Sequence, residues 1–207
     1  MEESYRSLCS SKDIELDGIF GKRQEKALIG SKATNHNDKA VIRRGSFHVY
    51  KYTGNEEKLA VCKKLGADVC INYKTEDFVA RVKEETGGKG VDVILDCIGA
   101  AYLQRNLDSL NFDGRLCIIG LQSGTVAEIK LNTLLPRRLT VQGAGMRART
   151  PENKAMVVNE VEKNVWPEVV AVKLKPIIYK SFPLSEAGEG HKLMESNEHI
   201  GKILLVP

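Results

Sequence analysis

The residues that could take part in binding or catalysis lie in short turns, and each turn directly follows an apolar segment. In open parallel α/β sheets, ligands bind at the carboxyl ends of the strands. Glycine in such a turn lets a ligand approach the backbone closely. The turns therefore indicate one ligand site along the edge of a predicted sheet, and they begin at Gly54, Asp96, Gly120 and Gly143.

The first of these turns bears on the choice of cofactor. A site selective for NAD normally places an acidic residue at this strand end, where it bonds the ribose hydroxyls. This chain has Gly54 there, which leaves room for a larger group, and Lys58 follows one turn into a predicted helix. A cation in that place suits the 2′-phosphate of NADPH. The alternative is an exposed helix start whose Lys58 is merely solvated.

The other three turns each allow two interpretations. Gly99 follows Asp96 and would let the backbone approach a ring, or would only permit a tight strand-to-helix turn. Gly120 begins a flexible turn of the same kind. Arg147 and Arg149 stand beside a predicted helix start, where they suit a phosphate, although arginines in such places also occur in solvated loops.

Several other chemistries are excluded by the sequence. The four histidines show no spacing typical of metal ligands, and neither G-x-S-x-G nor a Walker A motif occurs. The 31 basic residues are interleaved with 27 acidic ones, which does not indicate a nucleic-acid partner. No segment has the length of a membrane span, and the acidic start has no apolar h-region, so we expect no secretory signal. We expect a cytoplasmic protein whose five cysteines are reduced.

Alternating strand and helix patterns predict a parallel sheet with helices on both faces. Asn55, Thr75, Thr150 and Ser185 stand where they would N-cap helices, and Pro167 should split the longest helix. Apolar runs predict strands over residues 47–52, 69–71, 91–96, 115–120, 139–142, 177–179 and 202–206.

The first 45 residues fit this pattern poorly. They are polar, and only residues 19–20 and 27–29 suggest a short helix. A Rossmann domain opens with a strand, a G-x-G-x-x-G turn and a helix, which together hold the pyrophosphate. No glycines with that spacing precede residue 46. We therefore expect a poorly ordered segment over residues 1–45 and a partial NADPH-binding domain, with two C-terminal strands, over residues 46–207.

Six short motifs follow one another in a fixed order along residues 49–207. They are Gly54-Asn55-Glu56-Glu57-Lys58-Leu59, Leu65-Gly66-Ala67-Asp68, Ile71-Asn72-Tyr73, Gly90-Val91-Asp92-Val93-Ile94-Leu95-Asp96, Asp113-Gly114-Arg115 and His199-Ile200-Gly201-Lys202-Ile203. In order and spacing they resemble the zinc-independent NADPH:quinone oxidoreductases. These form the zeta-crystallin-like branch of the medium-chain dehydrogenase/reductase superfamily.

This resemblance implies a two-domain enzyme that transfers hydride from NADPH to a quinone-like small molecule, and it implies a homodimer. It assigns no catalytic residue. The family's all-β catalytic domain and glycine-rich turn have no counterpart here, so we expect an incomplete Rossmann-like sheet in a truncated form of the enzyme. The alternative is a non-catalytic interaction or dimerisation module derived from the family. The implied cofactor contacts are Gly54, Lys58, Tyr73, Gly120, Leu121, Met146 and Arg147.

Overall fold

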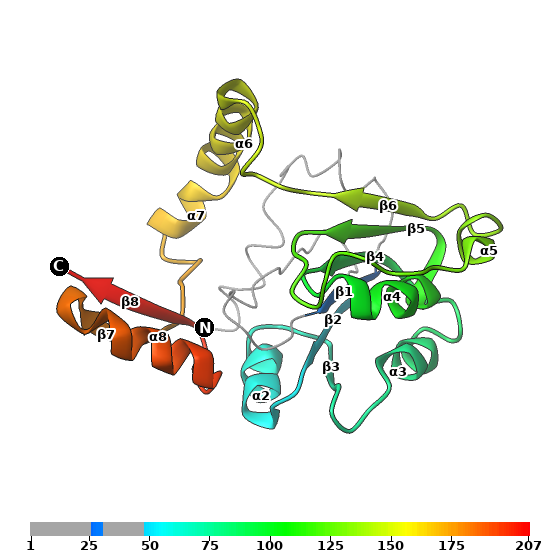
Figure 1. Cartoon of the computed structure of the whole chain (residues 1–207), viewed down its shortest axis with the longest axis horizontal. Helices are drawn as coiled ribbons and strands as arrows, with labels where there is room; N and C mark the ends of the chain where they lie inside the picture. Colours follow the sequence, from blue (N-terminus) through cyan, green and yellow to red (C-terminus); the bar gives the residue numbers. More distant parts are fainter. Residues whose placement is uncertain (1–25, 31–47) are drawn as a thin grey trace.

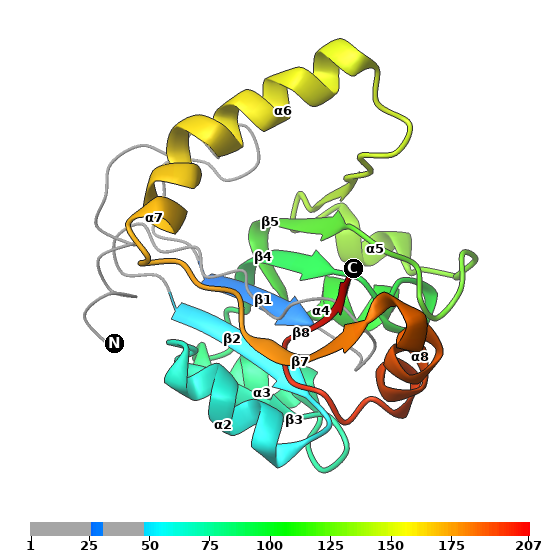
Figure 2. The same ribbon diagram turned by 90° about the vertical axis from the view of Figure 1, so that its left-hand side faces the viewer.

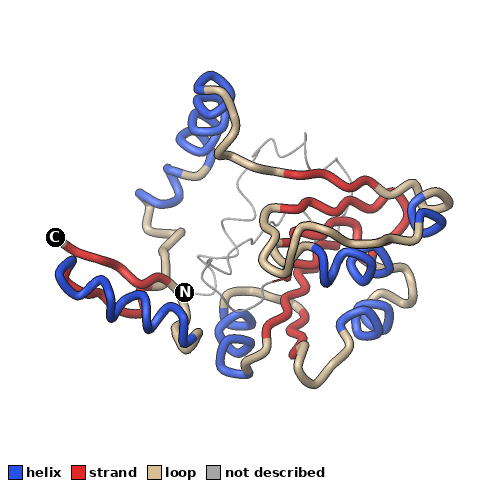
Figure 3. The backbone as a smooth tube through the Cα atoms, viewed as in Figure 1, coloured by secondary structure: helices blue, strands red, loops and turns tan. Residues whose placement is uncertain are grey.

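The described strands form a six-stranded parallel sheet and a separate parallel pair (Figures 1 and 3). The computed structural model describes residues 26–30 and 48–207. The order of the large sheet is β3-β2-β1-β4-β5-β6, and that of the small one is β7-β8. The strands are β1 (Lys26–Gly30), β2 (His48–Thr53), β3 (Val69–Asn72), β4 (Val91–Asp96), β5 (Leu110–Ile118), β6 (Thr140–Gly143), β7 (Ile178–Pro183) and β8 (Lys202–Val206).

Helices connect most of these strands, as the sequence pattern predicts. No helix among the described residues has both the length and the apolar character needed to cross a bilayer. The helices are α2 (Glu56–Lys64), α3 (Phe78–Glu85), α4 (Leu103–Ser109), α5 (Leu131–Leu134), α6 (Pro151–Asn164), α7 (Trp166–Val170) and α8 (Ala187–Ser196), with short 3-10 turns at Ala100–Tyr102 and Leu184–Glu186.

Strand β1 corrects two expectations about the start of the chain. Residues 27–29, where a short helix was expected, belong to a strand that pairs in parallel with both β2 and β4. The opening strand of the nucleotide fold, expected to be missing, is therefore present at the centre of the sheet. A short apolar run does not distinguish strand from helix by itself, and the neighbouring strands decide here. The expectations for residues 1–25 and 31–45 lie outside the described residues.

Helices cover both faces of the sheet, which confirms the predicted α/β class. Neighbouring residues of a strand point to opposite faces. On β3, the Cys70 thiol donates to the carbonyl of Leu59 in α2, whereas Ile71 packs in a cluster with Phe78 of α3 and Leu107 of α4. Helix α2 therefore lies on one face, and α3 and α4 lie on the other. The cluster consists of Ile71, Phe78, Val82, Val91, Ile94, Leu107, Leu110 and Leu116.

The predicted N-caps at Asn55 and Thr150 are confirmed. Their side chains accept hydrogen bonds from backbone N–H groups in the first turns of α2 and α6. The prediction for Thr75 is wrong, because Asp77 stands directly before α3 and accepts from Val79 and Ala80 at 2.8 and 3.1 Å. The hydroxyl of Thr75 lies instead in the turn after β3, where it donates to the Asn72 carbonyl.

Two predictions about the last third of the chain have different outcomes. Pro167 lies in the first turn of α7, and the interruption at Val165 separates α7 from α6, as predicted. The predicted cap at Ser185 is wrong: this residue lies within the 3-10 turn before α8, and neither that turn nor α8 has a side-chain cap.

The C-terminal strands do not extend the large sheet. Strands β7 and β8 pair in parallel with each other, and α8 packs on both of them. Helix α6 lies away from the large sheet in both Figure 1 and Figure 2. Neither α6 nor α7 has a buried residue, and Trp166 is 58% exposed. The part of the chain that the structure describes therefore leaves an apolar surface on these two helices.

Candidate functional site

The turns identified from the sequence follow the carboxyl ends of neighbouring strands. The register pairs Thr53 with Asn72 across β2 and β3, and Asp96 with Ile118 across β4 and β5. It also pairs Ile118 with Gly143, the last residue of β6. The turns after these strands consequently open along one edge of the sheet. This edge is where parallel α/β folds bind ligands, so it is the candidate site.

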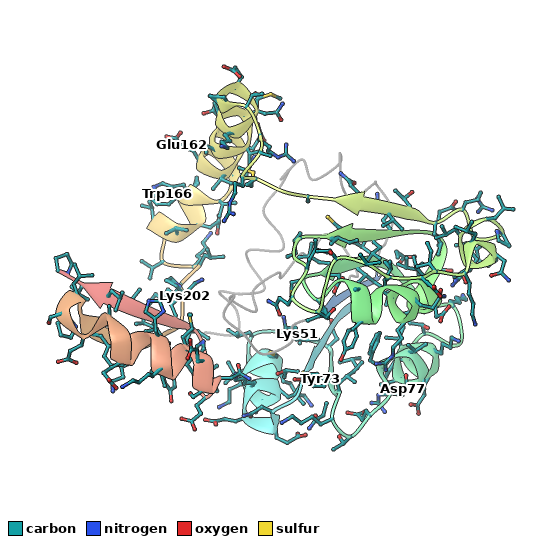
Figure 4. All side chains as sticks on the ribbon, in the orientation of Figure 1. Lys51, Tyr73, Asp77, Glu162, Trp166 and Lys202 are labelled. Carbon is teal, nitrogen blue, oxygen red and sulfur yellow. The ribbon has the colours of Figure 1, made fainter. Side chains whose placement is uncertain are left out.

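Gly54 and Tyr73 are brought into contact by the pairing of β2 with β3. The backbone N–H of Tyr73 donates to the carbonyl of Thr53 at 3.2 Å. Gly54 is buried, and a Cβ atom built on it would lie 2.6 Å from Cζ and 2.7 Å from Oη of Tyr73. Burial, followed by the neighbouring Tyr102, raises the pKa of the Tyr73 phenol. The ring labelled in Figure 4 thus occupies the place of a side chain at position 54.

A hydrogen-bonded network around Asn72 holds these two turns together. Its side-chain amide donates to the carboxylate of Glu56, the first residue of α2, and accepts from the backbone N–H of Lys74 at 3.1 Å. Its backbone N–H donates to the carboxylate of Glu76 at 2.9 Å. The start of α2 and the end of β3 therefore form one connected unit.

Lys58 is buried and held by the C-terminal end of α8. The residue is only 7% exposed. The ammonium donates to the backbone carbonyl of Asn197 at 2.7 Å and to the side-chain oxygen of the same residue at 3.1 Å. The alternative of a solvated Lys58 at an exposed helix start is therefore wrong. A buried cation stands beside the end of β2.

Two buried polar atoms in this region have no hydrogen-bond partner among the described residues. One is Oγ1 of Thr53, the last residue of β2, and the other is Nδ1 of His199. Burial, and then the charge of Lys58, lowers the pKa of His199. Unpartnered buried polar atoms are uncommon in proteins, and each one calls for an explanation such as a bound water, ion or polar ligand. The end of β2 therefore fits a polar group.

The turns after β4 and β5 form a second connected unit. The backbone N–H groups of Gln122 and Ser123 donate to the carbonyls of Cys97 and Ile98. A Cβ on Gly120 would lie 3.1 Å from the Cys97 carbonyl oxygen, so these turns approach each other closely. Gly99 has a φ of +85°, which glycine adopts without strain, and its neighbours are Leu121 and Gly124.

Asp96 fixes the turn after β4. Its carboxylate accepts from the backbone N–H groups of Ile98 and Gly99, each at 2.9 Å. Burial raises the pKa of this carboxyl group, while the two donors act in the opposite direction. Ser123 adds a bridge, because its hydroxyl donates to the carbonyl of Ile98 and accepts from the N–H of Ala101. Gly99 thus forms a tight turn, and this turn lies at the candidate ligand edge of the sheet.

Met146 and Arg147 lie in the exposed segment after β6. Four spacings of about 4.8 Å separate β6 from β2, or roughly 19 Å along the sheet edge. Met146 is 45% exposed, and the Arg147 carbonyl accepts from Lys154. The Arg149 guanidinium is bonded to the Gly145 carbonyl and to the Asn153 side chain. The structure therefore joins Gly54, Lys58 and Tyr73 at one end of the edge, and it leaves Met146 and Arg147 at the other.

Two residues of the site escaped the sequence reasoning. Asn197 has a φ of +61°, a left-handed conformation that asparagine tolerates better than most residues. An asparagine shortly after a predicted helix was the available signal for such a helix end. His199 belongs to the C-terminal motif of the resemblance, but nothing in the sequence places it near Lys58.

The chain matches the family model described as zinc-binding dehydrogenase over residues 40–163. It is 37% identical over 156 residues to the 2-haloacrylate reductase of a Burkholderia species, covering 73% of this chain and 46% of that protein. It is 32% identical over 160 residues to quinone oxidoreductase 1 of Escherichia coli, covering 74% of this chain and 47% of that protein. The chain thus spans about half the length of these curated relatives.

Solved structures show the same fold. The crystal structure of 2-haloacrylate reductase matches with a TM-score of 0.71 at 31% identity, covering 100% of this chain and 62% of that one. The Escherichia coli quinone oxidoreductase complexed with NADPH matches with a TM-score of 0.70 at 26% identity, covering 99% and 62%. Among the described residues, no three His, Cys, Asp or Glu side chains are grouped so that they could hold a metal ion.

Proposed function

Because the chain belongs to the zinc-binding dehydrogenase family of the medium-chain dehydrogenase/reductase superfamily, we propose that it is the cofactor-binding part of an NADPH-dependent quinone oxidoreductase. The observation that carries this proposal is the pair of residues at the end of β2. Gly54 stands where an NAD-selective site has an acid, and the buried ammonium of Lys58 lies beside it. A buried cation beside a strand end that has glycine in place of the selecting acid favours a cofactor with a 2′-phosphate.

Different residues at the sheet edge would contact different parts of the cofactor. Gly54, Lys58 and Tyr73 would hold the phosphorylated adenosine end, where Thr53 and His199 offer unpartnered polar atoms. Gly120 and Leu121 lie three strands away from β2, roughly 14 Å, and would contact the nicotinamide end. Met146 and Arg147 would close the site beyond β5.

When bound, the cofactor supplies the hydride, while the protein supplies binding, orientation and exclusion of water. The substrate class follows from what the two named relatives act on. A quinone and a 2-haloacrylate both contain a carbon–carbon double bond conjugated to a carbonyl or carboxyl group. Reduction of either acceptor would use one hydride from the cofactor and one proton from solvent, giving a hydroquinone from a quinone or a saturated acid from a 2-haloacrylate. We propose the same class of substrate for this protein.

We also expect the protein in the cytoplasm. The cysteines of the described residues would stay free thiols there.

Titration of the purified chain with NADPH tests this proposal, with the enhancement of nicotinamide fluorescence as the signal. We expect a dissociation constant for NADPH in the micromolar range, which corresponds to a binding free energy on the order of −8 kcal/mol. NADH should bind more weakly. Absence of binding at millimolar NADPH would contradict the proposal. A quinone-dependent loss of NADPH absorbance would extend it to the reaction.

A second candidate function is a non-catalytic dimerisation module derived from the same family. It is favoured by β6, whose four residues are all exposed and which pairs only with β5 among the described strands. An edge strand of this kind offers free backbone groups to a second chain. A stable dimer in sedimentation, together with absence of NADPH binding, would favour this function over the first.

A further inference from the structure

We propose that the Tyr73 ring forces position 54 to remain glycine and thereby fixes the cofactor selectivity of this chain. The acid that would select NAD cannot be introduced at Gly54 unless Tyr73 is shortened as well. This inference rests on the proposed function, because it concerns the same end of β2. Its structural part, the steric coupling between two residues on neighbouring strands, can be tested without any cofactor.

The backbone at Gly54 would itself accept a side chain. Gly66, Gly99 and Gly201 have positive φ angles, which disfavour any other residue, but Gly54 is not among the glycines in that conformation. The obstacle is contact alone. A Cβ atom would lie 2.6 Å from Cζ and 2.7 Å from Oη of Tyr73. The third neighbour, Cε of Lys74 at 2.9 Å, belongs to a flexible side chain that can move at little cost.

The Tyr73 ring is not free to move in the same way. Its backbone N–H is bonded to the Thr53 carbonyl, directly before Gly54. The preceding residue, Asn72, is tied to Glu56 and Glu76 by side-chain hydrogen bonds. The ring itself packs against the hydrophobic cluster that contains Ile71. Rotating the ring away from position 54 would therefore give up packing, and moving the backbone would break the junction of β2, α2 and β3.

An aspartate at position 54 meets the same obstacle in a stronger form. Its Cβ already collides with the ring, and its carboxylate needs space beyond Cβ. The acid could not reach the ribose hydroxyls, yet its charge would repel the 2′-phosphate. In this chain, Gly54→Asp should therefore lose NADPH without gaining NADH. Only the double variant Gly54→Asp/Tyr73→Ala opens the place in which the acid can act.

The first experiment is a double-mutant cycle read out by thermal unfolding of the whole chain. Gly54→Ala alone should lower the Tm by roughly 3–10 °C, because it overpacks the contact with the ring. In the Tyr73→Ala background, the same substitution should raise the Tm by about 1–4 °C, because alanine restricts the unfolded chain and now has room. The effect of one substitution thus changes sign with the other.

Gly188→Ala provides the matched control. Gly188 lies in α8, and a Cβ built on it meets nothing within 4 Å. It should raise the Tm by the same amount whether residue 73 is tyrosine or alanine. Additive Tm shifts for Gly54→Ala and Tyr73→Ala would overturn the proposal.

The second experiment measures NADPH and NADH affinities by fluorescence titration. Gly54→Asp should weaken NADPH at least tenfold and leave NADH unimproved, while Gly54→Asp/Tyr73→Ala should bind NADH at least tenfold more tightly than Gly54→Asp does. A gain of NADH binding in Gly54→Asp with Tyr73 intact would overturn the inference about selectivity. If the unsubstituted chain binds neither cofactor, the proposed function fails, and the Tm cycle still decides whether Tyr73 excludes a side chain at position 54.

Discussion

The ammonium of Lys58 is bonded to the backbone carbonyl and the side-chain oxygen of Asn197, two residues separated by 139 positions in the sequence. This contact joins α2, at the candidate cofactor site, to the end of α8 in the C-terminal unit, which consists of β7, α8 and β8. Because Lys58 is buried, the contact is shielded from solvent more than a surface pair would be. The cofactor binding that we propose at the end of β2 and the position of α8 would therefore depend on the same side chain.

Lys58→Ala should weaken NADPH binding more than NADH binding, because only NADPH carries the 2′-phosphate. A charge-assisted contact of this kind contributes about 1.5–3 kcal/mol, or roughly ten- to a hundredfold in affinity. Fluorescence titration with both cofactors measures the difference. Lys64→Ala, at an exposed position in the last turn of the same helix, is the control and should change neither affinity. An equal loss for both cofactors would argue against the phosphate role.

Val141→Pro should disrupt a homodimer formed through the exposed edge of β6. Proline lacks the N–H group and cannot donate to a neighbouring strand. Successive N–H groups of a strand point to opposite edges, so Gln142→Pro covers the case in which the Val141 group faces β5. Sedimentation velocity compares both variants with Val141→Ala, which keeps the N–H group and should stay dimeric. If both proline variants sediment as the same dimer, the pairing surface lies elsewhere.

Asp77→Ala should destabilise the chain by about 1 kcal/mol, because it removes the N-cap of α3. Hydrogen bonds from the Ala80 and Val79 backbone lower the pKa of this carboxyl group below its usual 3.8. Its contribution is therefore present above pH 3.8 and is lost as the pH falls through the lowered pKa. Urea unfolding should show that Asp77→Asn, which keeps an acceptor, and Thr75→Ala are both milder. A larger effect of Thr75→Ala would contradict the assignment of the cap.

Acidification should destabilise the C-terminal unit through His199. Burial and the charge of Lys58 lower its pKa below the ordinary value of 6.5, so the folded state binds a proton less readily than the unfolded state. The stability associated with neutral His199 is present above pH 6.5 and is lost as the pH falls through the lowered pKa. Thermal unfolding between pH 5 and 8 should show this slope, and His199→Gln should flatten it. His191→Gln, at an exposed position, should leave the slope unchanged.

Local patterns in the sequence were enough to predict the α/β class and several of the places where helices begin or are interrupted. Asn55 caps α2, and Pro167 lies where the longest helix is interrupted, because caps and prolines act on hydrogen bonds within a few residues. The absence of an acid at Gly54 is equally visible in the sequence, since the strand before it has a clear apolar pattern. Tyr73 entered the site only through the family resemblance.

The tertiary structure alone decided which of these residues meet. The sequence suggested a short helix over residues 27–29, and only the pairing with β2 and β4 on either side shows that they form a strand. The contacts of Tyr73 with Gly54, and of Lys58 with Asn197, depend on which strands and helices become neighbours. A sequence pattern records the period with which side chains face a core, and this period is a local property. Contacts between distant segments follow from the order of strands in the sheet, which only the packing of the whole chain determines.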